Sequence, residues 1–337
     1  MLRLIRFPSR RSIAISIPVY RKPRPLRGYL YIGAASFLWG VAATMGRAAF
    51  TGRLLPGGEA IAAIDPLILS QTRTGFTFLV LFAALVWRRG WASLGVPRRD
   101  LAWLAVLGVA GLAASNFTYY VAIQRTNVAT AIILQYTAPI WVLLYLALRG
   151  TQKPKPQQVA AVGLALPGIA LLIDLFGAGQ FRMDRLGIAA AMLSAFAFAF
   201  YNVSAHGVLA RYDRWRVLLY VTGSAALFWT LVNPPWNVLA GNYSPRQWTF
   251  MAVFAVVSAL GPFAFYAAGL QHLDPARAMI AACMEPVFAI LLASIALGEV
   301  IGPMQLAGGL LVLGAIVVVE WPGRRKPSGE VAMEPLE

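Results

Sequence analysis

Ten stretches of mostly apolar residues, each about 20 residues long and ended by charged residues, glycine or proline, constrain this chain most. A helix of that length crosses the hydrocarbon core of a bilayer, which is about 30 Å thick. Continuous apolar runs exclude a β-barrel, whose strands alternate over about ten residues. The sequence therefore predicts an all-α polytopic membrane protein with ten transmembrane helices. The spans are expected at 28–50, 66–87, 101–123, 127–148, 157–175, 186–209, 216–233, 247–270, 275–297 and 302–321.

The composition agrees with this class. Hydrophobic residues make up 59% of the 337 residues and charged residues only 12%, whereas soluble chains have about 45–50% and about 25%. A soluble domain of this size could not cover so much apolar surface with polar groups. A soluble enzyme, a coiled coil and intrinsic disorder are therefore excluded.

The isoelectric point of 10.6 raises the question of a nucleic-acid partner, which the placement of the charges answers. With the N-terminus inside, the cytoplasmic segments carry 21 Lys and Arg, counting Arg216 at the first position of the seventh span, and the external loops carry five. This asymmetry follows the positive-inside rule and predicts cytoplasmic termini in a plasma (bacterial inner) membrane, with no nucleic-acid partner. The basic tail 1–27 is either a disordered cytoplasmic tail or an arm that touches anionic lipid, and 322–337 is a cytoplasmic tail.

The chain also repeats itself at a constant offset of 147 residues. Each half holds five spans, and because five is odd, the second half enters the membrane with the opposite orientation. The sequence therefore predicts two inverted five-helix repeats, 28–176 and 177–321, an arrangement found in secondary transporters with a solute site near the midplane. The matching pairs are Tyr119 and Tyr266, Gln124 and Gln271, Ala129 and Ala276, Ala131 and Ala278, Pro139 and Pro286, and Gln158 and Gln305.

Three parts of the sequence resemble the motifs of a known family. The stretch Met284–Val319 resembles the C-terminal signature of EamA-type members of the drug/metabolite transporter superfamily, and Ser36–Gly40 and Arg73 resemble its motifs in the first two spans. The resemblance implies ten helices in two inverted repeats, both termini inside, and efflux or exchange of small metabolites. The first half departs from the pattern at Gly150-Thr151-Gln152 and in a longer first loop, Thr51–Asp65. The signature residues are Glu285-Pro286, Gly298-Glu299, Gly302-Pro303, Gln305 and Gly308-Gly309.

The chain offers little enzymatic or metal chemistry. It has one cysteine and two histidines, and no Walker A motif. We therefore expect no enzyme activity, no cofactor and no metal, and an ion or solute gradient as the driving force. Packing or interface roles are expected for His206 and His272.

Two ionisable residues inside predicted spans are the sharpest candidates, because charges in the membrane are costly and tend to face a partner or a cavity. Glu285 lies near the middle of the ninth span and is either a proton or substrate-amine site or half of a structural ion pair. Arg73 lies about 10 Å inside the second span, and it either binds an anionic group, pairs with Glu285 or extends to the interface. We expect Arg47 and Arg277, nearer span ends, to extend to the interface.

Polar and aromatic residues in mid-span complete the candidate site, since a cavity for an amphipathic solute needs aromatic walls and a few hydrogen-bonding groups. For each aromatic, a lipid-facing or interfacial place is the alternative. Pro139 and Pro286 are candidate hinges or static kinks. The further candidates are Trp39, Asn116, Tyr119, Tyr120, Gln135, Tyr136, Tyr201, Asn202 and Tyr266.

These features favour a secondary transporter that exports or exchanges small metabolites such as amino acids by alternating access around a midplane cavity. Its partners would be a small-molecule solute, the bilayer and protons as a coupling ion, and a monomer is compatible with this design. The alternatives are a membrane scaffold or sensor, which would have a sizeable soluble domain, and a membrane-embedded enzyme, which would have a catalytic cluster. The sequence has neither feature.

Overall fold

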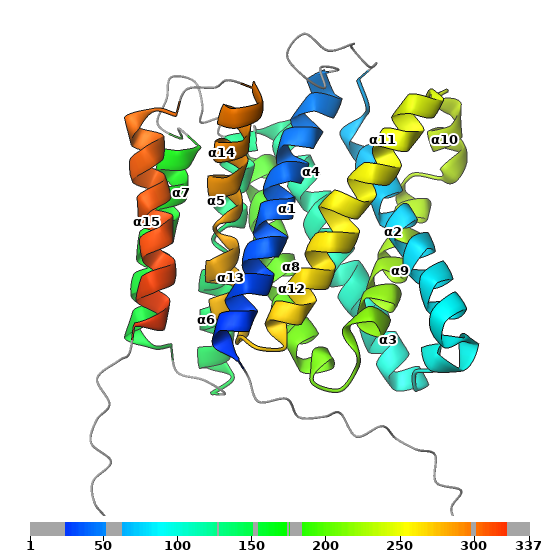
Figure 1. Cartoon of the computed structure of the whole chain (residues 1–337), viewed down its shortest axis with the longest axis horizontal. Coiled ribbons are helices and arrows are strands. Elements are labelled where there is room, and N and C mark those ends of the chain that lie inside the picture. The colour runs from blue at the N-terminus through cyan, green and yellow to red at the C-terminus, as the bar shows by residue number, and fades with distance from the viewer. Residues whose placement is uncertain are drawn as a thin grey trace, which may run out of the picture.

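A computed structural model describes residues 24–51, 63–126, 128–150, 154–173, 175, 184–297 and 301–321, and it is all-helical over these residues. Figure 1 shows the helices running roughly side by side. The predicted all-α class is therefore confirmed for the described residues. The helices are α1 (Pro25–Thr51), α2 (Pro66–Arg89), η1 (Trp91–Leu94), α3 (Arg98–Val106), η2 (Leu107–Ala113), α4 (Ala114–Arg125), α5 (Val128–Gln135), α6 (Ala138–Leu148), α7 (Pro156–Leu172), α8 (Arg185–Leu209), α9 (Arg214–Val232), α10 (Pro235–Ala240), α11 (Pro245–Ala255), η3 (Val256–Leu260), α12 (Gly261–Leu270), α13 (Pro275–Ala282), α14 (Glu285–Leu297) and α15 (Pro303–Glu320).

Eight helical segments among the described residues are long and apolar enough to cross a membrane. The remaining two predicted spans, 157–175 and 302–321, coincide with α7 and α15, which are apolar but shorter. The segments α3, η2 and α4 follow one another without a gap, as do α11, η3 and α12. In both of these long helices the middle segment is π-helical, a feature that the sequence analysis did not predict.

Several helices begin at a polar residue followed by proline, which explains why span boundaries can be read from the sequence. The Asp65 carboxylate accepts hydrogen bonds from the backbone N–H groups of Leu67 and Ile68 at 2.8 and 3.2 Å. Proline at the next position has no N–H to leave unsatisfied and already has a helical φ angle. Asp274 before Pro275 and Ser244 before Pro245 repeat this arrangement.

The helices pack in a few close pairs. The helix α1 lies against α12, α13 and α14, while α8 lies against α4, α5 and α6. The helices α2 and α9 lie side by side, and so do α7 and α15, which form the left edge of the bundle in Figure 1. One apolar cluster joins parts of α1, α2, η2, α8, α9 and α12, and a second joins parts of α6, α7, α13 and α15. The helix α13, at whose end the candidate site lies, contributes residues to both clusters.

Candidate functional site

The fourth predicted span is interrupted halfway. The helix α5 ends at Gln135, and α6 begins at Ala138 after a turn of two residues. Pro139 has no N–H, so the Gln135 carbonyl cannot receive the hydrogen bond of a continuous helix. In the turn, the Thr137 N–H donates to the Leu134 carbonyl at 3.1 Å, which tightens the chain. The break lies about 12 Å along the span from its first residue.

The ninth predicted span has a break at the corresponding place. The helix α13 ends at Ala282, and α14 begins at Glu285, again with proline as the second residue of the new helix. The Met284 N–H donates to the Ala281 carbonyl at 3.2 Å. The turn residues Cys283 and Met284 stand 147 positions after the turn residues of the first break. The sequence pattern pointed to both positions through the prolines, but it predicted a kink or hinge within one helix.

Side chains from the two breaks meet. The Tyr136 hydroxyl and the Glu285 carboxyl share a hydrogen bond. Tyr119, from α4, and Cys283 also lie close enough to Glu285 to interact with it electrostatically. Because Glu285 stands ten residues after the start of α13, it lies about 15 Å along the span, which is half of a hydrocarbon core. A carboxyl group, two phenols and a thiol therefore gather near the middle of the bundle.

Arg73 extends the cluster from α2. Its Nη2 group donates a hydrogen bond to Asn116 Oδ1 on α4 at 2.9 Å. The guanidinium also interacts electrostatically with Glu285 and Tyr119, but the described residues show no ion pair between Arg73 and Glu285. Asn116 therefore holds the cation near the carboxyl group without a direct contact between the two charges.

The sequence-predicted site residues fall into two groups by exposure. The first group is partly accessible and the second is buried. A polar side chain that is partly accessible can still contact a solute or water. This half-buried group comprises Trp39, Arg73, Asn116, Tyr119, Tyr120, Gln135, Tyr136 and Glu285, and the buried group comprises Tyr201, Asn202 and Tyr266.

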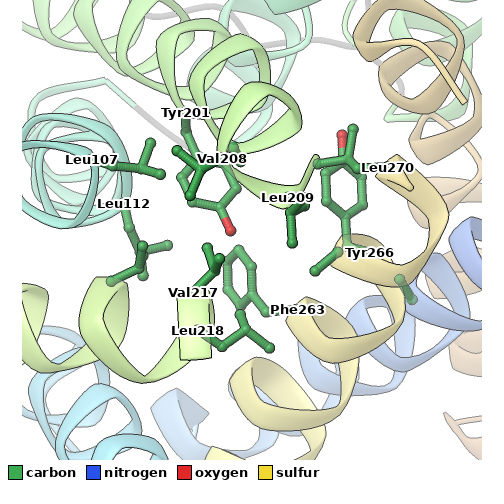
Figure 2. Close-up of a cluster of buried hydrophobic side chains, with 14 of the residues drawn as sticks. Leu107, Leu112, Tyr201, Val208, Leu209, Val217, Leu218, Phe263, Tyr266 and Leu270 are labelled. Atoms are coloured by element: carbon green, nitrogen blue, oxygen red, sulfur yellow. The ribbon is translucent and has the colours of Figure 1, made fainter. Parts of the chain in front are cut away.

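The buried group ties three helices together. The Tyr266 hydroxyl on α12 donates to Asn202 Oδ1 on α8, and the Asn202 amide donates to the Phe198 carbonyl at 2.8 Å. The Trp39 ring on α1 packs against the Tyr266 ring at a centroid distance of 5.4 Å. Figure 2 shows Tyr201 and Tyr266 among the apolar side chains of one buried cluster. These side chains brace α1, α8 and α12 beside the half-buried group.

One polar connection was missed by the sequence analysis. Ser115 on α4 and Ser194 on α8 each donate to the other's backbone carbonyl, at 3.2 and 2.8 Å. The Gln135 amide, at the first break, donates to Ser194 Oγ at 3.0 Å. Small polar residues in apolar helices are the only signal for such a contact. The neighbours Gln135 and Tyr136 therefore contact two different helices, α8 and α14.

The remaining polar candidates lie elsewhere. Arg277 forms an ion pair with Asp274 at 3.1 Å. The His206 Nδ1 atom is 2.9 Å from the Leu270 carbonyl, and the His272 ring stacks on Tyr31. The Arg47 side chain, Thr151, Gln152, Gly298, Glu299 and most of 1–27, 51–65 and 322–337 lie outside the described residues. No group of three His, Cys, Asp or Glu side chains that could hold a metal occurs among the residues described.

Comparison with known proteins identifies the family. The model of the EamA-like transporter family matches residues 26–174 and again residues 185–321. The chain belongs to the EamA-like transporter family. The resemblance of the chain to this family, first inferred from short motifs, is therefore confirmed.

Curated proteins similar to this EamA-like transporter are themselves named transporters. The inner membrane transporter YicL of Salmonella typhimurium is 25% identical over 273 residues, which cover 77% of this chain and 90% of YicL. The threonine/homoserine exporter RhtA of Escherichia coli K12 is 26% identical over 272 residues, covering 78% of this chain and 85% of RhtA. A solved crystal structure shares the fold, with a TM-score of 0.71 and 19% identity over 88% of this chain and 97% of that one.

Membership in the EamA-like family, together with the apolar helices, makes the chain an integral membrane protein of the transporter class. A lipid bilayer and a small-molecule solute are the partners that this class implies.

Proposed function

We propose that this chain is a secondary transporter that exports or exchanges small metabolites such as amino acids by alternating access. The observation that carries the proposal is the meeting of two interrupted helices around the half-buried Glu285, Tyr136 and Tyr119, with Arg73 held nearby by Asn116. Interrupted helices at the midplane are a common way to build a solute site in secondary transporters. RhtA is named as an exporter of threonine and homoserine, which supports amino acids as the first solutes to test.

The architecture proposed is ten spans in two inverted repeats, 28–176 and 177–321. Its support is that contacts between the two repeats are matched when the repeats are exchanged: a contact made by a helix of one half has a counterpart made by the equivalent helices of the other half. The first span (α1) packs against the eighth (α12) and ninth (α13 and α14), and the sixth (α8) packs against the third (α4) and fourth (α5 and α6). The family model also matches twice, once in each half. Rocking of one repeat against the other would expose the central residues to one side at a time.

The orientation proposed has both termini in the cytoplasm of a cell with this chain in its plasma (bacterial inner) membrane. The excess of 21 basic residues over five supports it. The first turn of α1 and the last turn of α15 lie at the same, lower end of Figure 1. Reporter fusions to the C-terminus test this arrangement, because an external C-terminus contradicts it.

The proposed roles follow the geometry. Glu285 receives a proton or the ammonium group of a solute, and Tyr136 orients its carboxyl group. Arg73, positioned by Asn116, binds a solute carboxylate. Trp39 and Tyr119 supply aromatic walls, and the interruptions before Pro139 and Pro286 serve as hinges. Tyr201, Asn202 and Tyr266 keep α8 and α12 in place beside the site. No step in this scheme requires an enzyme nucleophile or a cofactor.

The deciding experiment is counterflow of amino acids into proteoliposomes that contain the full chain, with and without a pH gradient. We expect uptake of at least one amino acid, and we expect Glu285→Gln to abolish the response to the pH gradient while the protein still inserts. Asp213→Asn is the matched control, because it removes a carboxylate that lies outside the spanning helices and should leave transport intact. Unchanged pH dependence in Glu285→Gln would refute the role of Glu285.

Arg73 is tested with pairs of solutes. Arg73→Ala should reduce transport of an amino acid about tenfold or more, and it should have a smaller effect on the corresponding amide or alcohol, which lacks the carboxylate. An equal loss for both members of the pair would show that Arg73 maintains the structure and does not bind the solute carboxylate.

A further inference from the structure

Seven arginines gather at one end of the bundle, away from the two helix breaks. They come from the end of α2, the start of α3, and the α8–α9 turn with the first turn of α9, which Figure 1 shows at the lower end of the molecule. We call this surface the arginine rim. It consists of Arg88, Arg89, Arg98, Arg99, Arg211, Arg214 and Arg216.

Specific contacts hold the three segments of the rim together. The Arg89 guanidinium contacts Asp213 at 2.7 Å. The Tyr212 hydroxyl donates to Asp100, and Arg211 contacts the same carboxylate at 3.4 Å. The hydrogen bond to Asp100 raises the pKa of Tyr212 above its ordinary value, so this phenol remains a neutral donor. The rim is therefore a defined surface and not three unrelated loops.

The acidic residues of the rim are already occupied. Asp100 and Asp213 are the only two acids in 88–100 and 210–216, and both are bonded as described above. The other five arginines have no acidic partner among the described residues. Arg214 stacks over the Trp215 ring at 5.1 Å from its centroid, which orients the guanidinium but leaves its charge uncompensated.

Three of these five arginines are exposed, and they lie beside two exposed tryptophans. Arg88, Arg98 and Arg99 are exposed, and Trp87 and Trp91 are exposed by 83% and 68%. Exposed tryptophans at the ends of membrane helices lie at the headgroup level, where the ring meets both apolar and polar surroundings. The exposed arginines therefore lie at the depth of lipid phosphates.

The positions of the arginines along their helices increase the need for an outside anion. Arg98 and Arg99 lie in the first turn of α3, and Arg214 and Arg216 in the first turn of α9. A positive charge is disfavoured there because the helix dipole already makes that end positive. The cluster of like charges thus persists at a local cost that a bound anion would offset.

We infer that the arginine rim binds the headgroup of an anionic glycerophospholipid in the adjacent leaflet. The phosphodiester would accept hydrogen bonds from Arg88, Arg98 and Arg99, since guanidinium groups match phosphate oxygens in pairs. The acyl chains would lie along Trp87 and the apolar outer surface of α2. This binding is independent of the solute site and of the direction of transport.

The test is native mass spectrometry of the full chain in detergent, titrated with phosphatidylglycerol or with phosphatidylcholine of the same acyl chains. We expect preferential binding of phosphatidylglycerol by the unmodified chain. A charge-assisted hydrogen bond to a phosphate oxygen is worth about tenfold or more in affinity, so the variant Arg88→Gln/Arg98→Gln/Arg99→Gln should lose about tenfold or more of that preference. Elution from a sizing column at the unmodified position confirms that this variant is folded.

The matched control removes three exposed arginines at the same end of the helix bundle but outside the rim. The variant Arg24→Gln/Arg27→Gln/Arg149→Gln has the same net charge as the rim variant, and all three residues are exposed. We expect it to keep the lipid preference within about threefold. An equal loss in both variants would show a general effect of charge and overturn the inference. Displacement of phosphatidylglycerol by an equal concentration of inorganic phosphate would overturn it as well, since the rim would then bind a free anion.

Discussion

The close contact between α7 and α15 gives a prediction whose magnitude follows from the structure. A Cβ atom added to Gly308 would lie 2.5 Å from the Gly168 carbonyl oxygen and 2.7 Å from the Leu172 backbone nitrogen. Both are backbone atoms that cannot rotate away. Ordinary van der Waals contact begins at about 3.4 Å, so Gly308→Ala must move the two helices apart by almost 1 Å.

Gly314 on the same helix provides the control, because a Cβ atom there meets nothing within 4 Å. Alanine is better than glycine in a helix by up to about 1 kcal/mol at either position. This gain is common to both variants, so their difference in stability isolates the contact at Gly308. Overpacking of this kind costs about 1–3 kcal/mol.

The assay is the thermal midpoint of the full chain in detergent, measured as the monodisperse fraction that remains after heating. A difference of 1 kcal/mol corresponds to about 2–4 °C for a chain of 150–250 residues. The shift falls with chain length, so for these 337 residues we take about 2 °C per kcal/mol and expect Gly308→Ala to unfold about 2–6 °C below Gly314→Ala. Midpoints within 1 °C of each other would refute the close approach of α7 and α15.

Three further substitutions test other contacts. Tyr266→Phe should lower the free energy of unfolding by about 1–3 kcal/mol, because it leaves Asn202 Oδ1 buried without its donor. The control Tyr31→Phe keeps the ring that stacks on His272 and should not lower the free energy of unfolding by this amount. Gln71→Leu should destabilise the protein by a similar amount, because it removes both hydrogen bonds between the Gln71 side chain and Asn233, each at 2.7 Å. A thermal midpoint equal to that of Asn237→Ala would contradict this expectation. Arg89→Gln should change stability by less than about 1 kcal/mol, because both partners of its ion pair are partly exposed, and a larger loss would contradict this.

The helix boundaries were predictable because a bilayer restricts the backbone to structures that satisfy their own hydrogen bonds. Backbone groups in hydrocarbon must bond within the helix, so each span becomes a long apolar run that ends where polar residues can cap it. The second span was expected at 66–87 and is found at Pro66–Arg89. Asp65 and Pro66 mark its start in the sequence as clearly as in the structure.

The contacts between helices were not predictable in the same way. A helix of a soluble protein shows its buried face through a stripe of apolar residues. Helices such as α8 and α12 are apolar on nearly every side, so their sequence does not indicate which side meets protein and which meets lipid. How each helix is rotated about its own axis decides which polar side chains meet. The hydrogen bonds between Asn202 and Tyr266 and between Ser115 and Ser194 depend on this rotation. The prolines indicated where the two spans are interrupted, but not that Tyr136 and Glu285 meet there.

The first break has a mechanical consequence that arises from its two neighbouring residues. Gln135 is bonded to Ser194 on α8, and Tyr136 is bonded to Glu285 on α14. If α8 and α14 move relative to each other during transport, the movement must be absorbed between these two residues or must break one of the bonds. The turn at Tyr136 and Thr137 lacks the full hydrogen bonding of a helix, so it can change its dihedral angles at a lower cost than the helices on either side. In the proposed mechanism, a change in the charge of Glu285 would act first on the bond to Tyr136, so proton or solute binding would be linked to helix movement at this turn.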